Sequence, residues 1–185
     1  MYHKLYLYLV STCILIFTAC TPQGGAGRSQ TTVQSPASAL PINPPATCSI
    51  TRTSGVAFTP PAPYPPAPPA AYKGQFWYGT ADLWTMLGTD GLWADLPKSN
   101  SGYTQKIFWW RHGYDATTEP APELIVTGKR LDASAPSLVA SKATNAVADF
   151  GQAMLVGVDI PTPGCWQITG NYKGHELSFV VRVSP

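Results

Sequence analysis

The sequence predicts an all-β fold, and three observations predict it. From Gln75 onward, short runs rich in β-branched and aromatic residues are separated by turns containing Gly, Pro or Asn. No stretch of about 10 to 12 residues in this region shows a sustained helical stripe. The last run, Glu176–Val183, alternates apolar and polar side chains, as a strand does when one face of its sheet is buried.

The region that precedes the fold begins with a predicted signal peptide, residues 1–19. Lys4 is followed by the apolar run Leu5–Phe17, which is shorter than the about 20 residues that a membrane-spanning helix needs. The end of this run resembles the lipobox of bacterial lipoproteins, with Phe17 where Leu or Val is usual. The resemblance implies cleavage before Cys20 and attachment of lipid, including palmitate, to it. Ordinary secretion and a retained signal anchor are the alternatives.

Residues 20–47 are predicted to be the lipidated Cys20 and a disordered tether. The segment is rich in Gly, Ser, Thr, Gln, Pro and Ala and has no apolar periodicity, so it cannot bury enough surface to offset the entropy of ordering. A flexible chain of this length would hold the following domain about 30 Å from the lipid on average.

The β domain is predicted to span residues 48–185 and to contain a Pro-rich segment, residues 60–69. Seven of these ten residues are prolines, which favours polyproline II geometry. We expect this segment to be a stiff spacer at the surface. A ligand for an aromatic groove is the alternative.

The strands of this domain are predicted from period-2 alternation and from the turn residues between them. Together they fit an immunoglobulin-like antiparallel sandwich of about seven to nine strands, with a closed β-barrel as the alternative. Residues 49–58 are a further candidate strand, Ala143–Phe150 a candidate helical turn, and Asn171–His175 the turn of a hairpin. The predicted strands are Gln75–Gly79, Leu83–Leu87, Leu92–Leu96, Gln105–Trp110, Glu123–Leu131, Ser137–Ser141, Ala153–Ile160, Cys165–Gly170 and Glu176–Val183.

The cysteines predict one disulfide bond. Cys13 leaves with the signal peptide and Cys20 carries the lipid, so Cys48 and Cys165 remain in an oxidising compartment. Their bond would close a loop of 117 residues and restrict the unfolded chain by roughly 4 to 5 kcal/mol. A metal pair lacks the short ligand spacing of zinc sites, and free buried thiols are the other alternative.

The charge of the chain excludes a strongly electrostatic partner. Removal of Lys4 leaves 11 Lys and Arg residues against 10 Asp and Glu residues, a formal charge of +1. The cations are scattered, with Lys129 and Arg130 the only adjacent pair. We therefore expect neither nucleic-acid binding nor a polybasic membrane patch.

The aromatic segment around Trp109 and Trp110 is the strongest candidate for a binding site. Strand alternation sends these two side chains to opposite faces, so one is expected in the core and the other on the surface. An exposed Trp beside Arg111 and Tyr114 could stack on a sugar ring or an aromatic side chain. The interpretation that we favour is that the second Trp instead packs under the Pro-rich segment.

Acid–base chemistry has weaker support. His112 and Asp115 lie three residues apart in a predicted loop and could form half of a catalytic pair. Glu119 and Glu123 are expected to be solvated loop charges. The chain has no nucleophile elbow, zinc-protease helix motif, phosphate loop or calcium loop. We therefore expect no catalytic residue, no metal and no cofactor.

Three segments carry a resemblance to a wider group of proteins. Trp109–Arg111, Thr127–Ala133 and Pro163–Gly170 resemble recurring segments of uncharacterised bacterial exported proteins that end in a Gly-Cys-Trp strand and a hairpin. The resemblance covers about residues 48–183 and implies a secreted β-sandwich in which the early Cys pairs with the Cys of that motif. Trp166 beside Cys165 also resembles the Trp that packs on the immunoglobulin disulfide, although adjacency on one strand argues against an antibody-type domain.

These observations lead us to expect a lipid-anchored protein of the bacterial cell envelope, at the outer membrane or the outer face of the plasma membrane. Its β-sandwich is expected to act as an interaction module for an envelope polysaccharide or protein, with no identified ligand and no enzymatic activity. An envelope hydrolase that uses His112 and Asp115 and a purely structural envelope component are the alternatives.

Overall fold

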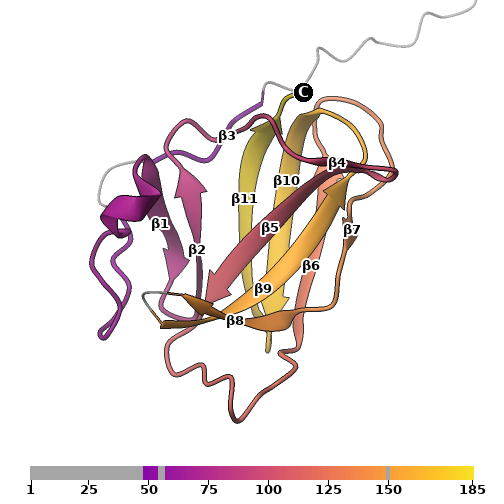
Figure 1. Ribbon diagram of the computed structural model, residues 1–185. Coiled ribbons are helices and arrows are strands. Elements are labelled where there is room, and N and C mark those ends of the chain that lie inside the picture. The colour runs from indigo at the N-terminus through magenta and orange to yellow at the C-terminus, as the bar shows by residue number, and fades with distance from the viewer. Residues whose placement is uncertain (1–47, 54–56, 149–150) are drawn as a thin grey trace, which may run out of the picture. The chain divides into compact units, whose positions relative to one another are not determined.

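Two facing β-sheets make up the described part of the chain (Figure 1). The computed structural model describes residues 48–53, 57–148 and 151–185. The predicted signal peptide, Cys20 and the tether lie outside these residues. No helix in the described segments is long and apolar enough to cross a membrane.

The larger sheet has the strand order β1-β2-β5-β9-β7, with β4 beside β5 and β8 beside β9. The smaller sheet has the order β3-β11-β10-β6, and its β3 runs parallel to β11. A 3-10 helix, η1 (Ala70–Tyr72), precedes the strands. The strands are β1 (Gln75–Thr80), β2 (Leu83–Gly88), β3 (Leu92–Trp93), β4 (Lys98–Ser99), β5 (Gly102–Trp110), β6 (Leu124–Arg130), β7 (Val139–Ala140), β8 (Thr144–Ala148), β9 (Gly151–Ile160), β10 (Gly164–Tyr172) and β11 (His175–Val183).

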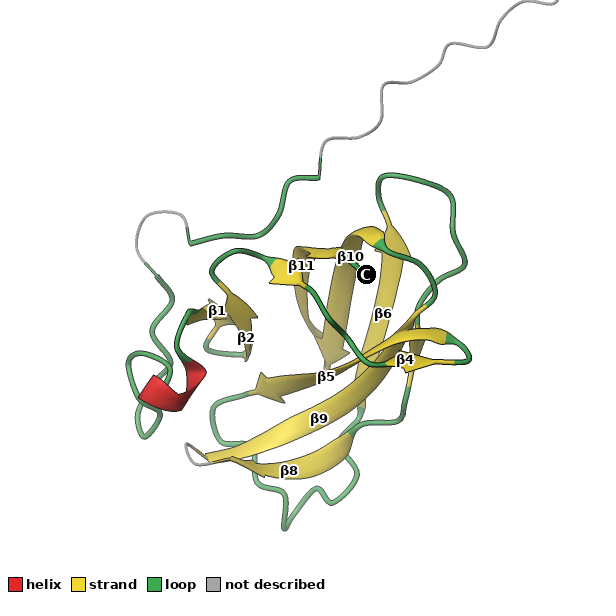
Figure 2. Cartoon of the chain, turned by 45° about the horizontal axis from the view of Figure 1, so that its top comes forward, coloured by secondary structure: helices red, strands yellow, loops and turns green. Residues whose placement is uncertain are grey.

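The all-β sandwich prediction is confirmed, and the described strands form two sheets instead of a closed barrel (Figure 2). The hairpin of β10 and β11 turns at Lys173 and Gly174, which both have positive φ. Positive φ is required in the two-residue turns whose twist matches that of the paired strands, and this explains the glycine at position 174.

Four predicted elements differ from the structure. The described residues of the candidate strand 49–58 form no strand, and the predicted strand Ser137–Ser141 is confined to Val139–Ala140. Residues 144–148, within the segment expected to form a helical turn, are strand β8, which pairs with residues 151–155 of β9. Pairing with β9 overrides the weak local preference of this Ala-containing run. The predicted strand Leu92–Leu96 is confined to Leu92 and Trp93, because the chain crosses there from one sheet to the other.

The main core lies between the two sheets. Alternate residues of the long strands point inward, as the sequence pattern predicts, and Trp109, Trp166 and Phe179 are among the largest buried side chains. The Trp109 and Phe179 ring centroids are 5.8 Å apart. Gly170 makes room for Trp109, since a Cβ at Gly170 would lie 2.6 Å from its ring.

A second apolar cluster covers the outer face of the larger sheet. Trp77, Trp84, Trp110 and Ala153 are buried there, although this face points away from the other sheet. The Pro-rich segment provides their cover: Tyr64 packs edge-on against Trp84 at 5.0 Å, and the Trp77 indole N–H donates to the Pro65 carbonyl at 3.1 Å. We call these four buried residues the outer cluster.

The predicted disulfide between Cys48 and Cys165 is present, with the two Cα atoms 5.5 Å apart. Cys165 is fully buried on β10. Beyond Cys48, the Thr51 N–H donates to the Val180 carbonyl at 2.9 Å, and the Val180 N–H donates to the Thr51 hydroxyl at 2.8 Å. The start of the described chain is thus fastened to both strands of the closing hairpin.

Candidate functional site

The aromatic segment at the end of β5 is buried. Trp109 and Trp110 point to opposite faces, as the alternation predicts, but both are 0 % exposed. Trp109 fills the core between the sheets, and Trp110 belongs to the outer cluster, where it stacks on Phe108 at 6.0 Å. The interpretation that one Trp is exposed for binding is therefore wrong, and the favoured one, in which the second Trp packs under the Pro-rich segment, is confirmed. Neither ring is available to stack on a ligand.

Arg111 and Tyr114 belong to a polar cluster built around Glu119. The Glu119 carboxylate accepts hydrogen bonds from the Tyr172 hydroxyl at 2.6 Å and from the Lys173 ammonium. The Tyr114 hydroxyl donates to the Asn145 amide oxygen, and its ring packs edge-on against Tyr172. The Arg111 guanidinium lies 5.5 Å from the centre of the Tyr172 ring. We call this arrangement the Glu119 network.

The network shifts the pKa values of its members. Burial acts to raise the pKa of Glu119, but the hydrogen bonds from Lys173, Tyr172 and the Glu123 N–H outweigh it, so this pKa lies below its usual value. Burial, together with the Glu119 charge, raises the pKa of Tyr114 to about 12. The hydrogen bond to Glu119 raises the pKa of Lys173. Glu119 thus stays ionised and fixes the loop between β5 and β6, a structural role.

His112 and Asp115 do not form a pair. The Asp115 carboxylate accepts hydrogen bonds from the N–H and the hydroxyl of Thr117, which close a turn and lower the pKa of Asp115. The exposed His112 makes only a long main-chain hydrogen bond, to Ala81 at 3.4 Å. Within the described ranges, no three His, Cys, Asp or Glu residues gather as a metal site would require. This geometry gives the hydrolase alternative no support.

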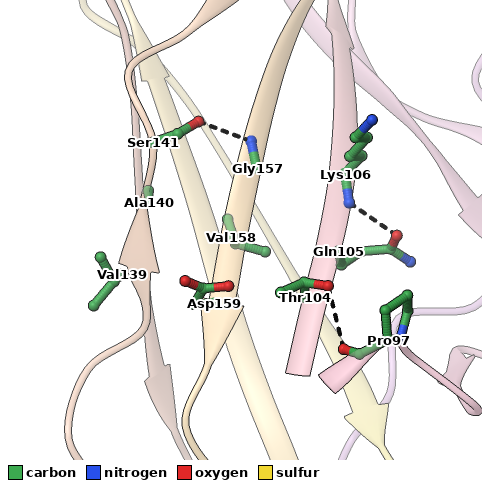
Figure 3. A pocket seen from close by; sticks show the side chains of 10 residues that line it. All are labelled: Pro97, Thr104, Gln105, Lys106, Val139, Ala140, Ser141, Gly157, Val158 and Asp159. Carbon is green, nitrogen blue, oxygen red and sulfur yellow. Dashed lines mark hydrogen bonds between the residues drawn. The ribbon is translucent and has the colours of Figure 1, made fainter. Parts of the chain in front are cut away.

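A groove on the outer face of the larger sheet is the best candidate for a ligand site (Figure 3). It has a volume of about 510 Å³ and lies over β5, β9 and β7, beyond the part of the face that the Pro-rich segment covers. Gly157 on β9 lies between Lys106 on one side and Ser141 on the other. Residues that line this Gly157 groove include Pro97, Thr104, Lys106, Val139, Ser141 and Asp159.

The polar groups of the Gly157 groove are only partly used within the protein. Ser141 accepts a hydrogen bond from the Gly157 N–H at 3.0 Å, and Asp159 accepts one from the Ser101 hydroxyl at 2.8 Å. Lys106 is exposed and forms no ion pair with any described residue. The Ser141 and Thr104 hydroxyls donate to the Lys142 and Pro97 carbonyls, at 3.0 Å and 3.2 Å. The groove therefore offers one ammonium as a donor, and one carboxylate and two hydroxyl oxygens as acceptors, beside the apolar Val139, which is 64 % exposed.

Gly157 is an unexpected residue for the floor of this groove. It lies in the middle of a ten-residue strand, where glycine costs about 0.5 to 1 kcal/mol relative to Ala. Packing explains Gly128 and Gly170, because a Cβ there would lie 2.2 Å and 2.6 Å from a neighbouring side chain. At Gly157 the nearest atom would be the Ser141 hydroxyl at an ordinary 3.6 Å. Strand glycines are found at bulges, at tight bends and where a ligand or another backbone approaches closely.

Sequence reasoning missed this groove and favoured the aromatic segment instead. The one available signal was a glycine within the predicted strand Ala153–Ile160. Its neighbours across the sheet, Lys106 and Ser141, are distant in sequence, so only the strand register brings them together.

Comparison with known proteins gives no relative: no protein-family model, no curated protein and no solved structure matches this chain. Its function is therefore inferred from its own geometry.

Proposed function

We propose that this chain is a lipid-anchored cell-envelope protein whose β-sandwich binds a neutral saccharide in the Gly157 groove. The anchor follows from the sequence: an apolar run of signal-peptide length ends in small residues before Cys20. The binding role is supported above all by Gly157, a mid-strand glycine at the floor of an open groove that neither packing nor a positive φ requires.

The lining of the groove favours a saccharide. Lys106 and Asp159 balance each other in charge, so the groove selects neither an anion nor a cation. The Lys106 ammonium can donate to sugar hydroxyls, and the Asp159 carboxylate and the hydroxyl oxygens of Thr104 and Ser141 can accept from them. The exposed Val139 and the bare Gly157 backbone provide an apolar surface for the C–H face of a sugar ring. The volume lies within the range of small-molecule sites.

The test is titration of the protein purified from the envelope with neutral oligosaccharides of glucose, mannose and N-acetylglucosamine, monitored by NMR. We expect at least one series to perturb the amide resonances of Gly157 and Lys106. Gly157→Val places a side chain on the floor, and Lys106→Met removes a charged donor. Each is expected to weaken binding about tenfold or more.

Lys129→Met is the matched control, because Lys129 is exposed on the outer face of the smaller sheet, outside the groove. It is expected to leave binding unchanged. Unfolding of each variant is measured in parallel, and Gly157→Val is expected to keep the fold because this position has room for a Cβ. A folded Gly157→Val protein that binds as the parent does would contradict the proposed site, and a response to peptides alone would contradict a saccharide.

The anchor has a separate test. Cys20→Ala removes the thiol to which the lipid would be attached, so we expect the variant to leave the membrane fraction. Partition into detergent after cell fractionation measures this. Metabolic labelling with an alkyne fatty acid should mark the parent and not the variant. A variant that stays in the detergent phase as fully as the parent would rule out lipid anchoring at Cys20.

A further inference from the structure

The free edge of β6 presents unused main-chain groups. β6 pairs with β10 along one edge only. On the other edge, the Gly128 carbonyl accepts a hydrogen bond from the Leu138 N–H at 3.3 Å. Alternate residues of a strand direct their N–H and C=O groups to the same side. The main-chain groups of Leu124 and Val126 therefore point away from β10, in the direction of Leu138.

Strand β7 presents a second such edge. The Ser141 N–H donates to the Gly157 carbonyl at 2.8 Å, so the main chain of Ser141 faces β9. By the same alternation, the main-chain groups of Ala140, which lies opposite Val158, face away from β9. Leu138 has the same parity and does bond to β6. The main-chain groups of Ala140 thus point toward the free edge of β6.

A groove of about 710 Å³ separates these two edges. Among the hydrogen bonds of the described residues, none joins residues 124–127 to residues 140–143. The groove is closed at one end by the bond between Leu138 and Gly128. Its lining includes Leu124, Val126 and Ala143, which are buried, and Ile125, which is 66 % exposed.

We propose that this slot between β6 and residues 140–143 binds an extended peptide segment of a partner protein, which inserts as an additional strand. An extended chain would supply N–H and C=O groups to both edges at once, which a saccharide could not do. Exposed, unpaired strand edges are otherwise protected in proteins by charge, proline or a bulge. The stretch Leu124–Thr127 has none of these.

The side chains specify the peptide further. Inward-facing positions meet Leu124, Val126 and Ala143, so alternate residues of the peptide are apolar. Charge contributes little: Lys173 is paired with Glu119, and Lys142 is balanced by Glu123 at the same rim. Binding is therefore weakly dependent on salt, in contrast to binding driven by surface charges.

The probe is a set of synthetic heptapeptides chosen from a randomised display library selected on the full-length protein. We expect the selected sequences to alternate apolar and polar residues. Peptide binding should slow hydrogen exchange at least tenfold at the amides of Val126 and Ala140, which point into the slot. Exchange at Ile125 and Thr127, which already bond to β10, should stay unchanged.

Two matched comparisons distinguish peptide binding through main-chain hydrogen bonds from peptide binding through side chains alone. Ala140→Pro removes an N–H that faces the slot, whereas Ala140→Ser keeps this N–H. We expect the first to lower affinity at least tenfold and the second to leave it unchanged. A peptide N-methylated at alternate bonded positions should lose binding even to the unaltered protein, so this comparison does not depend on how any variant folds.

Three outcomes would overturn the proposal. Equal binding by the N-methylated peptide would exclude main-chain pairing. Peptide binding without exchange protection at the slot amides would place the peptide elsewhere. A concentration-dependent dimer in sedimentation that buries the same amides without peptide would identify a second copy of this chain as the occupant.

Discussion

At the scale of single residues, Glu119 shows how a charge in a loop fixes local structure. Its carboxylate has a side chain 20 % exposed and receives hydrogen bonds from Tyr172 on the hairpin and from Lys173 in the turn. The loop between β5 and β6 is thereby attached to the smaller sheet. The expectation that Glu119 is a solvated loop charge is therefore wrong. Sequence could not show this, because the partners of Glu119 lie about 50 residues further along the chain and only the fold brings them near.

We expect Glu119→Gln to change how stability depends on pH. Because the folded protein lowers the pKa of Glu119, ionised Glu119 stabilises the fold above the ordinary Glu pKa, and this contribution disappears as pH falls through the lower folded value. Near neutral pH the variant should unfold about 1 to 2 kcal/mol more easily. The difference should close as pH falls from about 6 to about 3. Urea unfolding across this range measures it.

Glu123→Gln is the matched control, since the Glu123 side chain is exposed and accepts no hydrogen bond from a described residue. It should unfold as the parent does at every pH. Parallel pH profiles for the parent and Glu119→Gln would show that the carboxylate contributes nothing through its ionised form.

At the scale of elements, the positions of the strands were largely predictable from the sequence. The segment that covers the outer face of the larger sheet was not predictable from strand alternation. Period-2 alternation located β1, β2, β5, β6, β9, β10 and β11 within a few residues, because one buried sheet face imposes that pattern on each strand. Alternation also placed Trp109 and Trp110 on opposite faces. It could not show that residues 60–69 cover the second face, since that packing joins segments far apart in the sequence.

The Pro-rich segment is expected to protect the outer cluster through Tyr64. Tyr64→Ala removes a half-buried ring that packs against Trp84, so we expect the variant to lose about 1 to 3 kcal/mol of stability. Acrylamide should then quench tryptophan fluorescence more strongly, because Trp84 gains access to solvent. Pro66→Ala, at an exposed position of the same segment, should change neither quantity. Unchanged quenching in Tyr64→Ala would mean that other residues provide the cover.

At the scale of the whole domain, one covalent bond joins the start of the described chain to the closing hairpin. The disulfide between Cys48 and Cys165 encloses a separation of 117 residues, which includes the Pro-rich segment and most of the strands. Asp132 helps to fix the main chain beside this disulfide. Its carboxylate accepts a hydrogen bond from the Cys165 N–H at 3.1 Å and pairs with Arg130 at 2.6 Å. The two cysteines and the expected compartment were enough to predict this bond from the sequence.

We expect reduction, or the double change Cys48→Ala and Cys165→Ala, to lower the free energy of unfolding by about 2 to 5 kcal/mol, mainly because the unfolded chain regains the freedom that the closed loop removes. Urea unfolding with and without reductant measures this, and reductant should have no effect on the double variant. In Cys48→Ala alone, the Cys165 thiol should resist alkylation until the domain unfolds, because Cys165 is fully buried. Ready alkylation of Cys165 in folded Cys48→Ala would show that the disulfide, and not the packing of β10, keeps this strand covered.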